Sequence, residues 1–246
     1  MIKKILSILL FTISLFAENL KVAVAANVSY AIDELKNEFN KVYPNIKIDI
    51  TIGSSGKLAT QIKNGAPYDL FLSADMFYPN ILYKKNIAIS KPKVYAIGRV
   101  VIFSKDAADF SKGIYIVKNS DIKSVAIANP KTAPYGKAAF EALKNAKILN
   151  DVKRKLIYAE SVSQTLAYVF NAADLGFVSK SAMYAPKMKK YKKNVNWIEV
   201  DKNLYSPIKQ GAVILKNAKE KRYAKDFLNF IMSKKAKNIF KKYGYD

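Results

Sequence analysis

Hydrophobic positions follow two alternating periods from Asn19 onward. Residues 20–26 and 46–52 are short apolar or alternating runs that predict strands. Between them, apolar side chains recur at the three- and four-residue spacings of one helix face: Val28, Ile32, Leu35, Phe39 and Val42. A second helical stretch contains Leu58 and Ile62 and ends at Asn64-Gly65. The order strand, helix, strand, helix indicates an α/β protein.

The same alternation continues to the C-terminus. Further strands are predicted at 70–72, 94–104, 125–128, 176–178 and 210–215, and helices at 138–149 and 224–243, the last as one long helix or a helix pair. Strands that alternate with helices predict mostly parallel sheets, whose ligand sites lie where the carboxyl ends of strands lead into helix N-termini. We therefore expect the functional residues at those junctions.

The first 17 residues, MIKKILSILLFTISLFA, have a different pattern. Lys3 and Lys4 precede a 12-residue uncharged, mostly apolar run from Ile5 to Phe16, and Ala17 follows. A bilayer span needs about 20 apolar residues, so this layout is typical of a secretory signal peptide. We expect cleavage after Ala17 and a soluble, exported protein, located in the periplasm if the cell is Gram-negative.

The composition of this 246-residue chain excludes several kinds of catalytic and metal site. With 0 His and 0 Cys it has no histidine base, no thiol nucleophile, no disulfide and no imidazole or thiolate zinc site. Its 42 Lys+Arg against 19 Asp+Glu give a net charge of +23, and only Arg99, Arg154 and Arg222 are arginines. Base readout favours arginine, and export separates the protein from nucleic acid, so no nucleic-acid partner is expected. A positive surface can instead attract a small anion.

The loop Gly53-Ser54-Ser55-Gly56-Lys57 is the most suggestive local motif, because it joins a predicted strand to a predicted helix. Unpaired amides at a helix start, together with hydroxyl groups, favour an anion. The loop is not a nucleotide-binding Walker A motif, since Thr51 stands where that motif has its first glycine and Leu58 follows the lysine. A simpler alternative stays open: the serines only cap the helix and the glycines only make a tight turn.

Ser54 and Lys57 also match the SxxK spacing of serine acyltransferases, the one nucleophile and base pair open to a chain without histidine. The same spacing occurs elsewhere, at Ser90/Lys93, Ser120/Lys123 and Ser206/Lys209. A lysine-rich chain produces such matches by chance, so we do not expect an enzyme. Asp69 and Asp75 lack the spacing of a metal loop, and a turn or cap role is expected for them.

Two further junctions follow the same logic. In residues 128–136, two prolines and a glycine fix a loop that leaves the amides near Tyr135 free. In residues 159–163, a loop precedes a helical stretch with Leu166, Val169 and Phe170. With Asn27 after the first strand, four helix starts carry polar groups or bare amides, which suggests that they converge on one ligand.

Several segments together resemble periplasmic molybdate-binding proteins, the receptors of ABC importers with the type II periplasmic binding fold. The strongest match is NGAPYDLFLSAD at 64–75. It is accompanied along the chain by AVAAN ending at Asn27, GSSGKLATQI at 53–62, NPKTAPYGKAAFEAL at 129–143, AESV at 159–162, GFV at 176–178 and the tail FLNFIMSKKAKNIFKKYGYD.

This resemblance implies two lobes with mixed, mostly parallel sheets, joined by a two-strand hinge. We expect residues 18–97 plus 207–246 in lobe 1 and residues 98–206 in lobe 2. It also implies a monomer without a cofactor that binds molybdate or tungstate and delivers it to a transporter permease and its ATPase. The implied contacts to the oxygens of molybdate are Asn27, Ser55, Tyr135, Val162 and Ser179.

Two of these positions depart from the family pattern. Asn27 replaces a hydroxyl residue, and we expect its side-chain amide to donate instead. Ser179 replaces a tyrosine found in some members and cannot reach as far as a phenol. Ser54 is expected to support the loop rather than touch the anion.

The implied ligand agrees with the sequence chemistry. Molybdate and tungstate are dianions that need hydrogen-bond donors, whereas a protonated phosphate leaves its own O–H unpaired among donors, at a cost of about 1–3 kcal/mol. No lysine is needed in such a pocket. The alternatives left open are a receptor for another small anion, such as sulfate or an organic acid, and a Ser-Lys hydrolase. An organic acid usually requires an arginine clamp.

Overall fold

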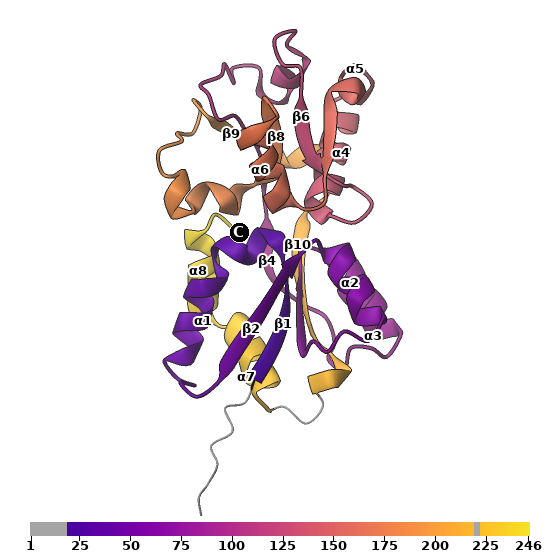
Figure 1. Ribbon diagram of the computed structural model, residues 1–246, viewed down its shortest axis with the longest axis vertical. Coiled ribbons are helices and arrows are strands. Elements are labelled where there is room, and N and C mark those ends of the chain that lie inside the picture. Colours follow the sequence, from indigo (N-terminus) through magenta and orange to yellow (C-terminus); the bar gives the residue numbers. More distant parts are fainter. Residues whose placement is uncertain (1–18, 219–221) are drawn as a thin grey trace, which may run out of the picture.

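Two five-stranded sheets, one in each of two stacked lobes, form the framework of the chain (Figure 1). The computed structural model describes residues 19–218 and 222–246. The predicted signal peptide at 1–17 lies outside the described residues. Among the described residues, no helix is both long and apolar enough to cross a membrane.

The first sheet belongs to lobe 1 and has the strand order β2-β1-β3-β10-β4. Its strands are β1 (Asn19–Ala25), β2 (Lys47–Gly53), β3 (Leu70–Ser73), β4 (Lys93–Gly98) and β10 (Ile208–Ile214). Strand β1 runs parallel to β2 and β3, whereas β10 runs antiparallel to β3 and β4. The carboxyl ends of β1, β2 and β3 therefore point toward the other lobe (Figure 1).

Helices cover both faces of this sheet (Figure 1). On one face, α1 (Ile32–Asn40), α7 (Arg222–Ile231) and α8 (Lys234–Lys242) pack on Leu20, Val22 and Val24 of β1. On the other face, α2 (Ser55–Lys63) and α3 (Phe77–Lys84) pack around Ala23, Phe71 and Val213. Because successive side chains of a strand point to opposite faces, β1 contributes to both cores.

The second sheet belongs to lobe 2 and has the order β7-β6-β8-β5-β9. Its strands are β5 (Val100–Phe103), β6 (Val125–Ala128), β7 (Leu156–Ala159), β8 (Leu175–Ser179) and β9 (Trp197–Glu199). The α-helices of this lobe are α4 (Pro134–Asn145), α5 (Leu149–Val152) and α6 (Val162–Asn171). Short 3-10 turns complete the description: η1 (Ala26–Tyr30), η2 (Gly113–Lys118), η3 (Lys153–Lys155), η4 (Lys180–Tyr184), η5 (Pro186–Met188), η6 (Lys202–Leu204) and η7 (Lys216–Ala218).

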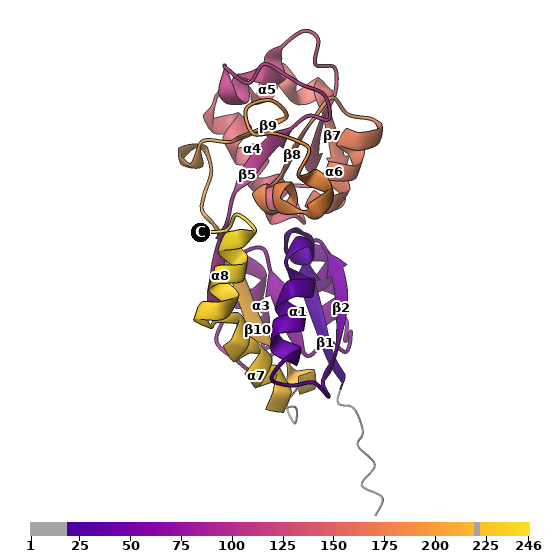
Figure 2. The same cartoon turned by 90° about the vertical axis from the view of Figure 1, so that its left-hand side faces the viewer.

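The chain passes between the lobes twice. It leaves the first sheet at Gly98 and enters the second at Val100, and it returns between Glu199 and Ile208 (Figure 2). The predicted strand at 94–104 is therefore two strands, β4 and β5, in different sheets. The C-terminus lies beside these crossings (Figure 2).

Several sequence predictions are confirmed and others are wrong. The α/β class holds, and the C-terminal helical stretch is a pair, since Ser233 caps α8 by accepting from the Ala236 amide. The predicted helix at 138–149 begins earlier, at Pro134, and ends at Asn145. Val42 is 72% exposed instead of buried, because α1 ends at Asn40. Strands β7 and β9 were not predicted.

Each sheet is mixed, but parallel pairing does not predominate. In the described part of each sheet, two strand pairings are parallel and two antiparallel. The physical reason is the double crossing, because β5 and β10, the first strands that the chain forms after each crossing, run against their neighbours.

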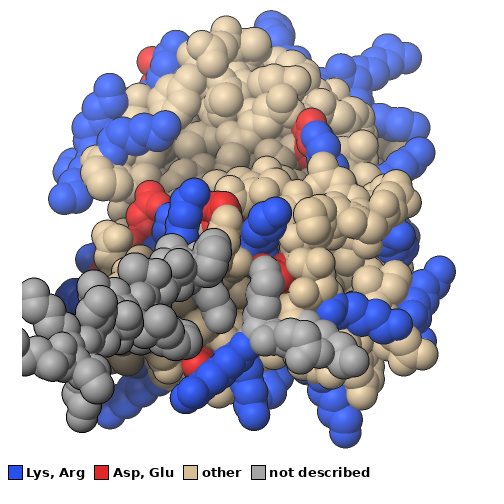
Figure 3. Space-filling view, turned by 60° about the horizontal axis from the view of Figure 1, so that its bottom comes forward, with Lys and Arg blue, Asp and Glu red and all other residues tan. Residues whose placement is uncertain are grey.

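The surface is strongly basic. Lysine and arginine side chains project on all sides of the face in Figure 3, with few acidic side chains among them. The run from Lys187 to Lys193 lies on exposed or half-buried turns of lobe 2 apart from the buried Met188. The positive charge is thus distributed over solvent-facing positions.

The structure confirms the cap role of Asp75 but not that of Asp69, which accepts hydrogen bonds from residues far along the chain. Asp69 is fully buried and accepts from the Lys21 backbone amide at 2.8 Å and from Asn217 Nδ2 at 2.9 Å. Asp75 is half-buried and accepts from the Tyr78 amide at the start of α3 at 3.3 Å.

We predict that Asp69→Ala lowers the free energy of unfolding by about 2–4 kcal/mol, since the Lys21 amide and Asn217 Nδ2 lose the buried carboxylate that accepts from both. Asp75→Ala is the matched control and costs about 1 kcal/mol, as is typical of a lost helix cap. Urea denaturation of both variants measures the difference, and an equal effect of the two substitutions contradicts the prediction.

Candidate functional site

A small cavity lies where the loops of the two lobes meet. About 190 Å³ of space outside the protein atoms lies there, part of it open to solvent. Lobe 1 contributes the residues that follow β1, β2 and β3, and lobe 2 contributes the starts of α4 and α6. The lining residues are Ala25, Ala26, Asn27, Ser54, Ser55, Ala74, Ala133, Pro134, Tyr135 and Val162. Four of the five predicted site residues are therefore brought together here, and Ser179 is not among them.

Ser55 begins α2 and is 1% exposed. Its Oγ accepts a hydrogen bond from the Ala74 backbone amide at 2.9 Å. A hydroxyl group has one hydrogen and two lone pairs, so this contact leaves the Ser55 hydrogen free to be donated. Ser55 is thus held as a donor that faces the cavity.

Ser54 precedes Ser55 at the N-cap position of α2, but its side chain does not cap the helix. Its Oγ is buried and has no hydrogen-bond partner in the structure. Buried hydroxyl groups are normally paired, so an unpaired one that lines a cavity points to a ligand. The interpretation of Ser54 as only a cap or a loop support is therefore not supported.

Two lobe 2 helices point their first turns at the same cavity. Pro134 occupies the first position of α4 and Tyr135 the second, and no side chain caps this helix. Val162 is the first residue of α6, where Ser161 accepts from the Gln164 amide and so uses a different donor. The amides of a helix's first turn have no carbonyl partner within the helix and carry the positive end of its dipole.

The expected role of the Asn27 side chain is wrong. Its Nδ2 donates to Gln210 Oε1 at 2.7 Å and to the Tyr245 hydroxyl at 2.8 Å, so both amide hydrogens are already used. What Asn27 can still offer is its backbone N–H, which lies in the first turn of η1 and has no acceptor within that turn.

Ser179 also departs from its expected place. It is buried at the end of β8, and its hydroxyl is hydrogen-bonded to that of Ser181 at 3.0 Å. Ser181 Oγ in turn donates to the Asn27 carbonyl at 2.8 Å. Ser179 is not among the residues that line the cavity, and Ser181 connects it to Asn27.

The cavity lining is electrically neutral, since none of the lining residues carries a charged side chain. Lys57 lies nearby, but its Nζ pairs with Glu160 Oε1 across the lobes at 2.7 Å, and both side chains are about half exposed. Among the described residues no group of three or more acidic side chains could hold a metal ion. The site therefore offers oriented dipoles rather than ions.

Direct contacts close the lobes over the cavity. The Gly56 amide donates to the Thr132 carbonyl at 2.8 Å, and Ser163 Oγ donates to the Ala26 carbonyl at 3.0 Å. The Tyr78 hydroxyl donates to the Lys131 carbonyl at 3.3 Å. The structure is thus a closed arrangement of the two lobes.

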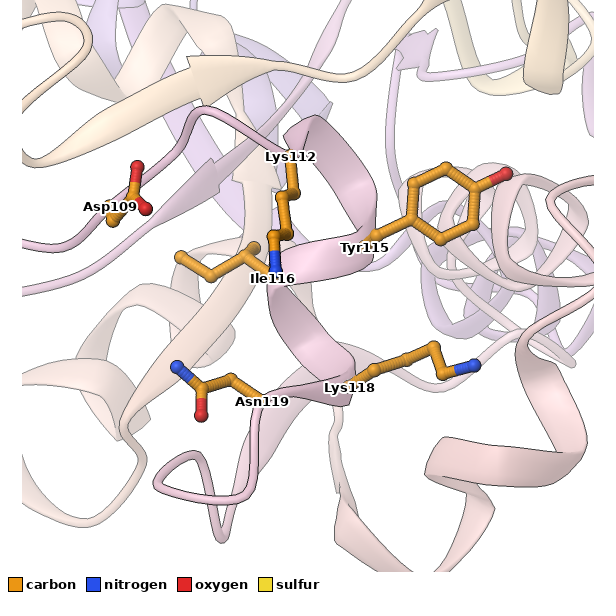
Figure 4. Close-up of a pocket in the computed structure, with 6 residues that line it drawn as sticks. All are labelled: Asp109, Lys112, Tyr115, Ile116, Lys118 and Asn119. Carbon is orange, nitrogen blue, oxygen red and sulfur yellow. The ribbon is translucent and has the colours of Figure 1, made fainter.

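A larger hollow elsewhere does not resemble a site. It lies beside η2, encloses about 870 Å³, and is lined by Asp109, Lys112, Tyr115, Ile116, Lys118 and Asn119. Figure 4 shows these side chains spreading in different directions instead of converging. Two of the polar groups have other partners, since Lys118 pairs with Asp151 and Asp109 accepts from the Ser111 amide.

Burial raises the pKa of the Tyr135 phenol well above its usual value of 10, and the nearby Tyr245, Tyr95 and Tyr205 raise it further. The Asn27 side chain lies beside this phenol and lowers its pKa, yet neither the Tyr135 hydroxyl nor Asn27 Oδ1 has a partner at hydrogen-bonding geometry. Burial also raises the pKa of Tyr245 far above 10. Both phenols therefore stay neutral donors at ordinary pH.

Sequence reasoning missed three contributors to this region. Ala74 offers its backbone amide to Ser55, and Gln210 and Tyr245 hold Asn27 from positions far along the chain. Ala74 lies in the motif at 64–75, which was a usable pattern. Nothing in the sequence near Gln210 or Tyr245 indicates their link to Asn27.

Comparison with known proteins places this geometry in a family. The model of the bacterial extracellular solute-binding proteins matches residues 20–246. The chain belongs to this family. It is 34% identical over 231 residues to the molybdate-binding protein ModA of Azotobacter vinelandii, covering 93% of this chain and 90% of that protein. It is 36% identical to ModA of Rhodobacter capsulatus over 227 residues, 91% of this chain and 86% of that protein.

A solved structure supports the same grouping within the family. The periplasmic molybdate-binding protein of Azotobacter vinelandii superimposes with a TM-score of 0.84 at 32% identity, covering 92% of this chain and 98% of that one. The resemblance to periplasmic molybdate-binding proteins and the type II periplasmic binding fold are therefore confirmed. These relatives are solute-binding proteins.

The raised pKa values predict how stability depends on pH. A phenol with a higher pKa in the folded protein keeps its proton longer than in the unfolded chain, so unfolding releases protons above pH 10 and stability falls as pH rises. We expect Tyr245→Phe to make this alkaline loss of stability shallower.

Urea unfolding of the wild type and Tyr245→Phe at several pH values between about 8 and 11 measures the slopes, with absorbance at the tyrosinate band recorded in parallel. Parallel slopes, or complete tyrosine ionisation while the fold is intact, would contradict the prediction.

Proposed function

We propose that this protein binds the molybdate dianion, and tungstate equally, in the cavity between its lobes and delivers it to an ABC transporter permease and its ATPase. Residues 18–97 plus 207–246 form one lobe and residues 98–206 the other, and they close by bending at the two crossings. Family membership and the ModA relatives support this proposal.

The observation that carries the proposal is the neutral ring of donors from both lobes. Helix starts and serine hydroxyls converge on one small space, and no charged side chain lines it. Such a ring suits an anion that carries two charges and no proton, because every oxygen of the anion can accept and none needs to donate.

Each donor has a defined role in this proposal. Ser55 donates through its hydroxyl hydrogen, because the Ala74 amide donates to Ser55 Oγ and leaves that hydrogen free. Ser54 donates through the hydroxyl that is otherwise unpaired. Asn27, Tyr135 and Val162 donate through backbone amides. Ser179 contributes only indirectly, through Ser181, so the fifth predicted contact is replaced by Ser54.

Selectivity follows from protonation and size. The backbone amides of this ring cannot accept from the O–H of a protonated phosphate. A serine hydroxyl that turns to accept it no longer donates to the anion, which costs about 1–3 kcal/mol. Sulfate has the same charge as molybdate but shorter bonds, so discrimination between the two depends on how far the lobes close. Charge-assisted hydrogen bonds contribute roughly 1.5–3 kcal/mol each, and five are enough for tight binding after the cost of ordering the lobes.

The location and partners follow from the same proposal. The N-terminal segment directs export, and the mature protein acts as a periplasmic monomer without a cofactor. Its basic surface raises the encounter rate with the anion and leaves the charge outside the binding site. Closure of the lobes is the state that the permease recognises.

The alternative functions have less support. A Ser-Lys hydrolase needs Lys57 as a base beside Ser54, but Lys57 is half exposed and paired with Glu160. An organic acid needs an arginine clamp, but Arg99 pairs with Asp246, and Arg154 and Arg222 are exposed outside the cavity lining. Sulfate is the competing ligand, and calorimetric titration distinguishes its affinity from that of molybdate.

We expect calorimetric titration to show tight binding of molybdate and tungstate, weaker binding of sulfate, and binding of phosphate roughly 10- to 100-fold weaker than that of molybdate. Ser55→Ala removes a charge-assisted bond and lowers molybdate affinity about 10- to 100-fold. Lys57→Ala is the control and changes affinity less than about fivefold, because exposed ion pairs contribute little. The reverse ranking of the two variants would favour the hydrolase.

We also expect Gly56→Ala to oppose closure. An added Cβ would lie 2.5 Å from the Tyr78 hydroxyl and 2.8 Å from the Thr132 carbonyl oxygen. Molybdate affinity should fall at least about tenfold, because the Thr132 backbone meets Gly56 only when the lobes are in contact, whereas the Tyr78 hydroxyl is the end of a lobe 1 side chain that can move aside. Small-angle scattering with saturating molybdate measures closure, and a fully compact variant with unchanged affinity would refute this account of the rim.

A further inference from the structure

The penultimate residue of the chain is tied to the first loop of the cavity. Tyr245 is 4% exposed, and its ring packs edge-on against Phe240 with centroids 5.4 Å apart. Its hydroxyl donates to the Asn27 carbonyl at 2.8 Å and accepts from Asn27 Nδ2 at 2.8 Å. This pair of hydrogen bonds holds the backbone and the side chain of Asn27 at once.

The chain end that carries Tyr245 is itself anchored. Gly244 makes the turn after α8 with a φ of 75°, a conformation that favours glycine. Asp246 exchanges two backbone hydrogen bonds of 3.0 Å with Ile97 of β4, and its carboxylate pairs with Arg99 at the first crossing. The turn at Gly244 and the contacts of Asp246 therefore fix the position of Tyr245 between them.

Gln210 determines which way the Asn27 amide faces. Its Nε2 donates to the Ile208 carbonyl at 2.9 Å and the Ala74 carbonyl at 3.2 Å, so its Oε1 must be the atom that faces Asn27. Asn27 then has to present Nδ2 to Gln210, and its second amide hydrogen reaches Tyr245. The network leaves no second orientation for the Asn27 side chain.

The same residue receives contacts from lobe 2. Ser181 Oγ donates to the Asn27 carbonyl, the oxygen that Tyr245 also contacts. The Tyr135 hydroxyl lies against Gly98, where an added Cβ would be 2.1 Å away. Asn27 thus lies where the loop after β1, the C-terminal residues and lobe 2 meet.

We propose that Tyr245 is a positioning residue of the oxyanion site that acts through Asn27. It holds the first turn of η1 so that the Asn27 backbone amide can donate to the ligand. This inference rests on the proposed function, because it needs an oxyanion in the cavity. Without the hydroxyl, the Asn27 carbonyl and one Nδ2 hydrogen each lose a partner in a buried space, and the loop rotates to find others.

The test compares Tyr245→Phe with wild type in calorimetric titrations with molybdate. We expect about a tenfold loss of affinity. Tyr243→Phe is the matched control, because the Tyr243 hydroxyl donates to Glu34 Oε2 at 3.1 Å on the flank of lobe 1, outside the cavity. The control should bind molybdate within about twofold of wild type. Circular dichroism confirms that both variants are folded at the temperature of the titration.

Two readouts separate positioning from general destabilisation. In an Asn27→Ala background, Tyr245→Phe should cost about threefold or less, since half of its contact with Asn27 is already gone. The Asn27 side-chain amide resonances, assigned by their loss in Asn27→Ala, should shift in Tyr245→Phe but not in Tyr243→Phe. Multiplicative effects of the two substitutions, or unchanged resonances, would overturn the inference.

The outcomes also separate this inference from the proposed function. A wild type that binds no molybdate overturns the function. A wild type that binds molybdate, with Tyr245→Phe within about twofold of it, overturns the positioning role alone.

Discussion

The site depends on one constraint: its polar groups must be able to donate hydrogen bonds without carrying charge. A serine hydroxyl can accept or donate, and the contact from the Ala74 amide uses one lone pair of Ser55 Oγ and leaves its hydrogen for donation to a ligand. The backbone amides at the starts of α4 and α6 have no such choice, because an amide only donates. The fold thus sets the polarity of the cavity through helix ends and one backbone contact, and the +23 net charge stays outside the lining.

The contacts between the lobes at the edge of the cavity are also hydrogen bonds between uncharged groups. Hydroxyl groups of lobe 2, on Ser163 and Ser181, donate to the carbonyls of Ala26 and Asn27 in lobe 1. The bare backbone of Gly56 lets its amide reach Thr132. Each of these bonds contributes only about 0.5–1.5 kcal/mol, so together they hold the two lobes in contact only weakly. Exposed ion pairs such as Lys57 with Glu160 add little to this balance.

Much of the fold could be predicted because hydrophobic periodicity is local. The buried runs of β3 and β6 and the capped start of α8 leave clear patterns in a few residues. The split of residues 94–104 into β4 and β5 could not be predicted, because both halves are apolar and only the position of the second sheet separates them. Strands β7 and β9 are short, and most of their residues are half-buried or exposed, so they lack a buried run.

The candidate site, too, is predictable from local patterns in some parts and depends on long-range packing in others. Ser55, Tyr135 and Val162 lie at the starts of α2, α4 and α6, and the loops that precede these helices were recognisable in the sequence. The direction of the Asn27 side chain depends on partners 183 and 218 positions away, which no local pattern reveals. Ser179 lies at the end of β8, but its hydroxyl is hydrogen-bonded to Ser181 and it does not line the cavity. The family resemblance supplied the positions, but only the packing shows which atom of each residue is left free.

The antiparallel strand β10 explains why such distant partners meet at Asn27. Strand β1 ends at Ala25, at the edge of the sheet that faces lobe 2, and β3 ends at the same edge. A parallel strand would bring its carboxyl end to that edge, but β10 runs the other way and brings its first residues there, with Gln210 among them. Antiparallel pairing in the first sheet therefore follows from the return crossing. Gln210, in the segment that re-enters lobe 1, therefore contacts Asn27 in the loop after β1. Tyr245, which follows the last helix, contacts the same residue.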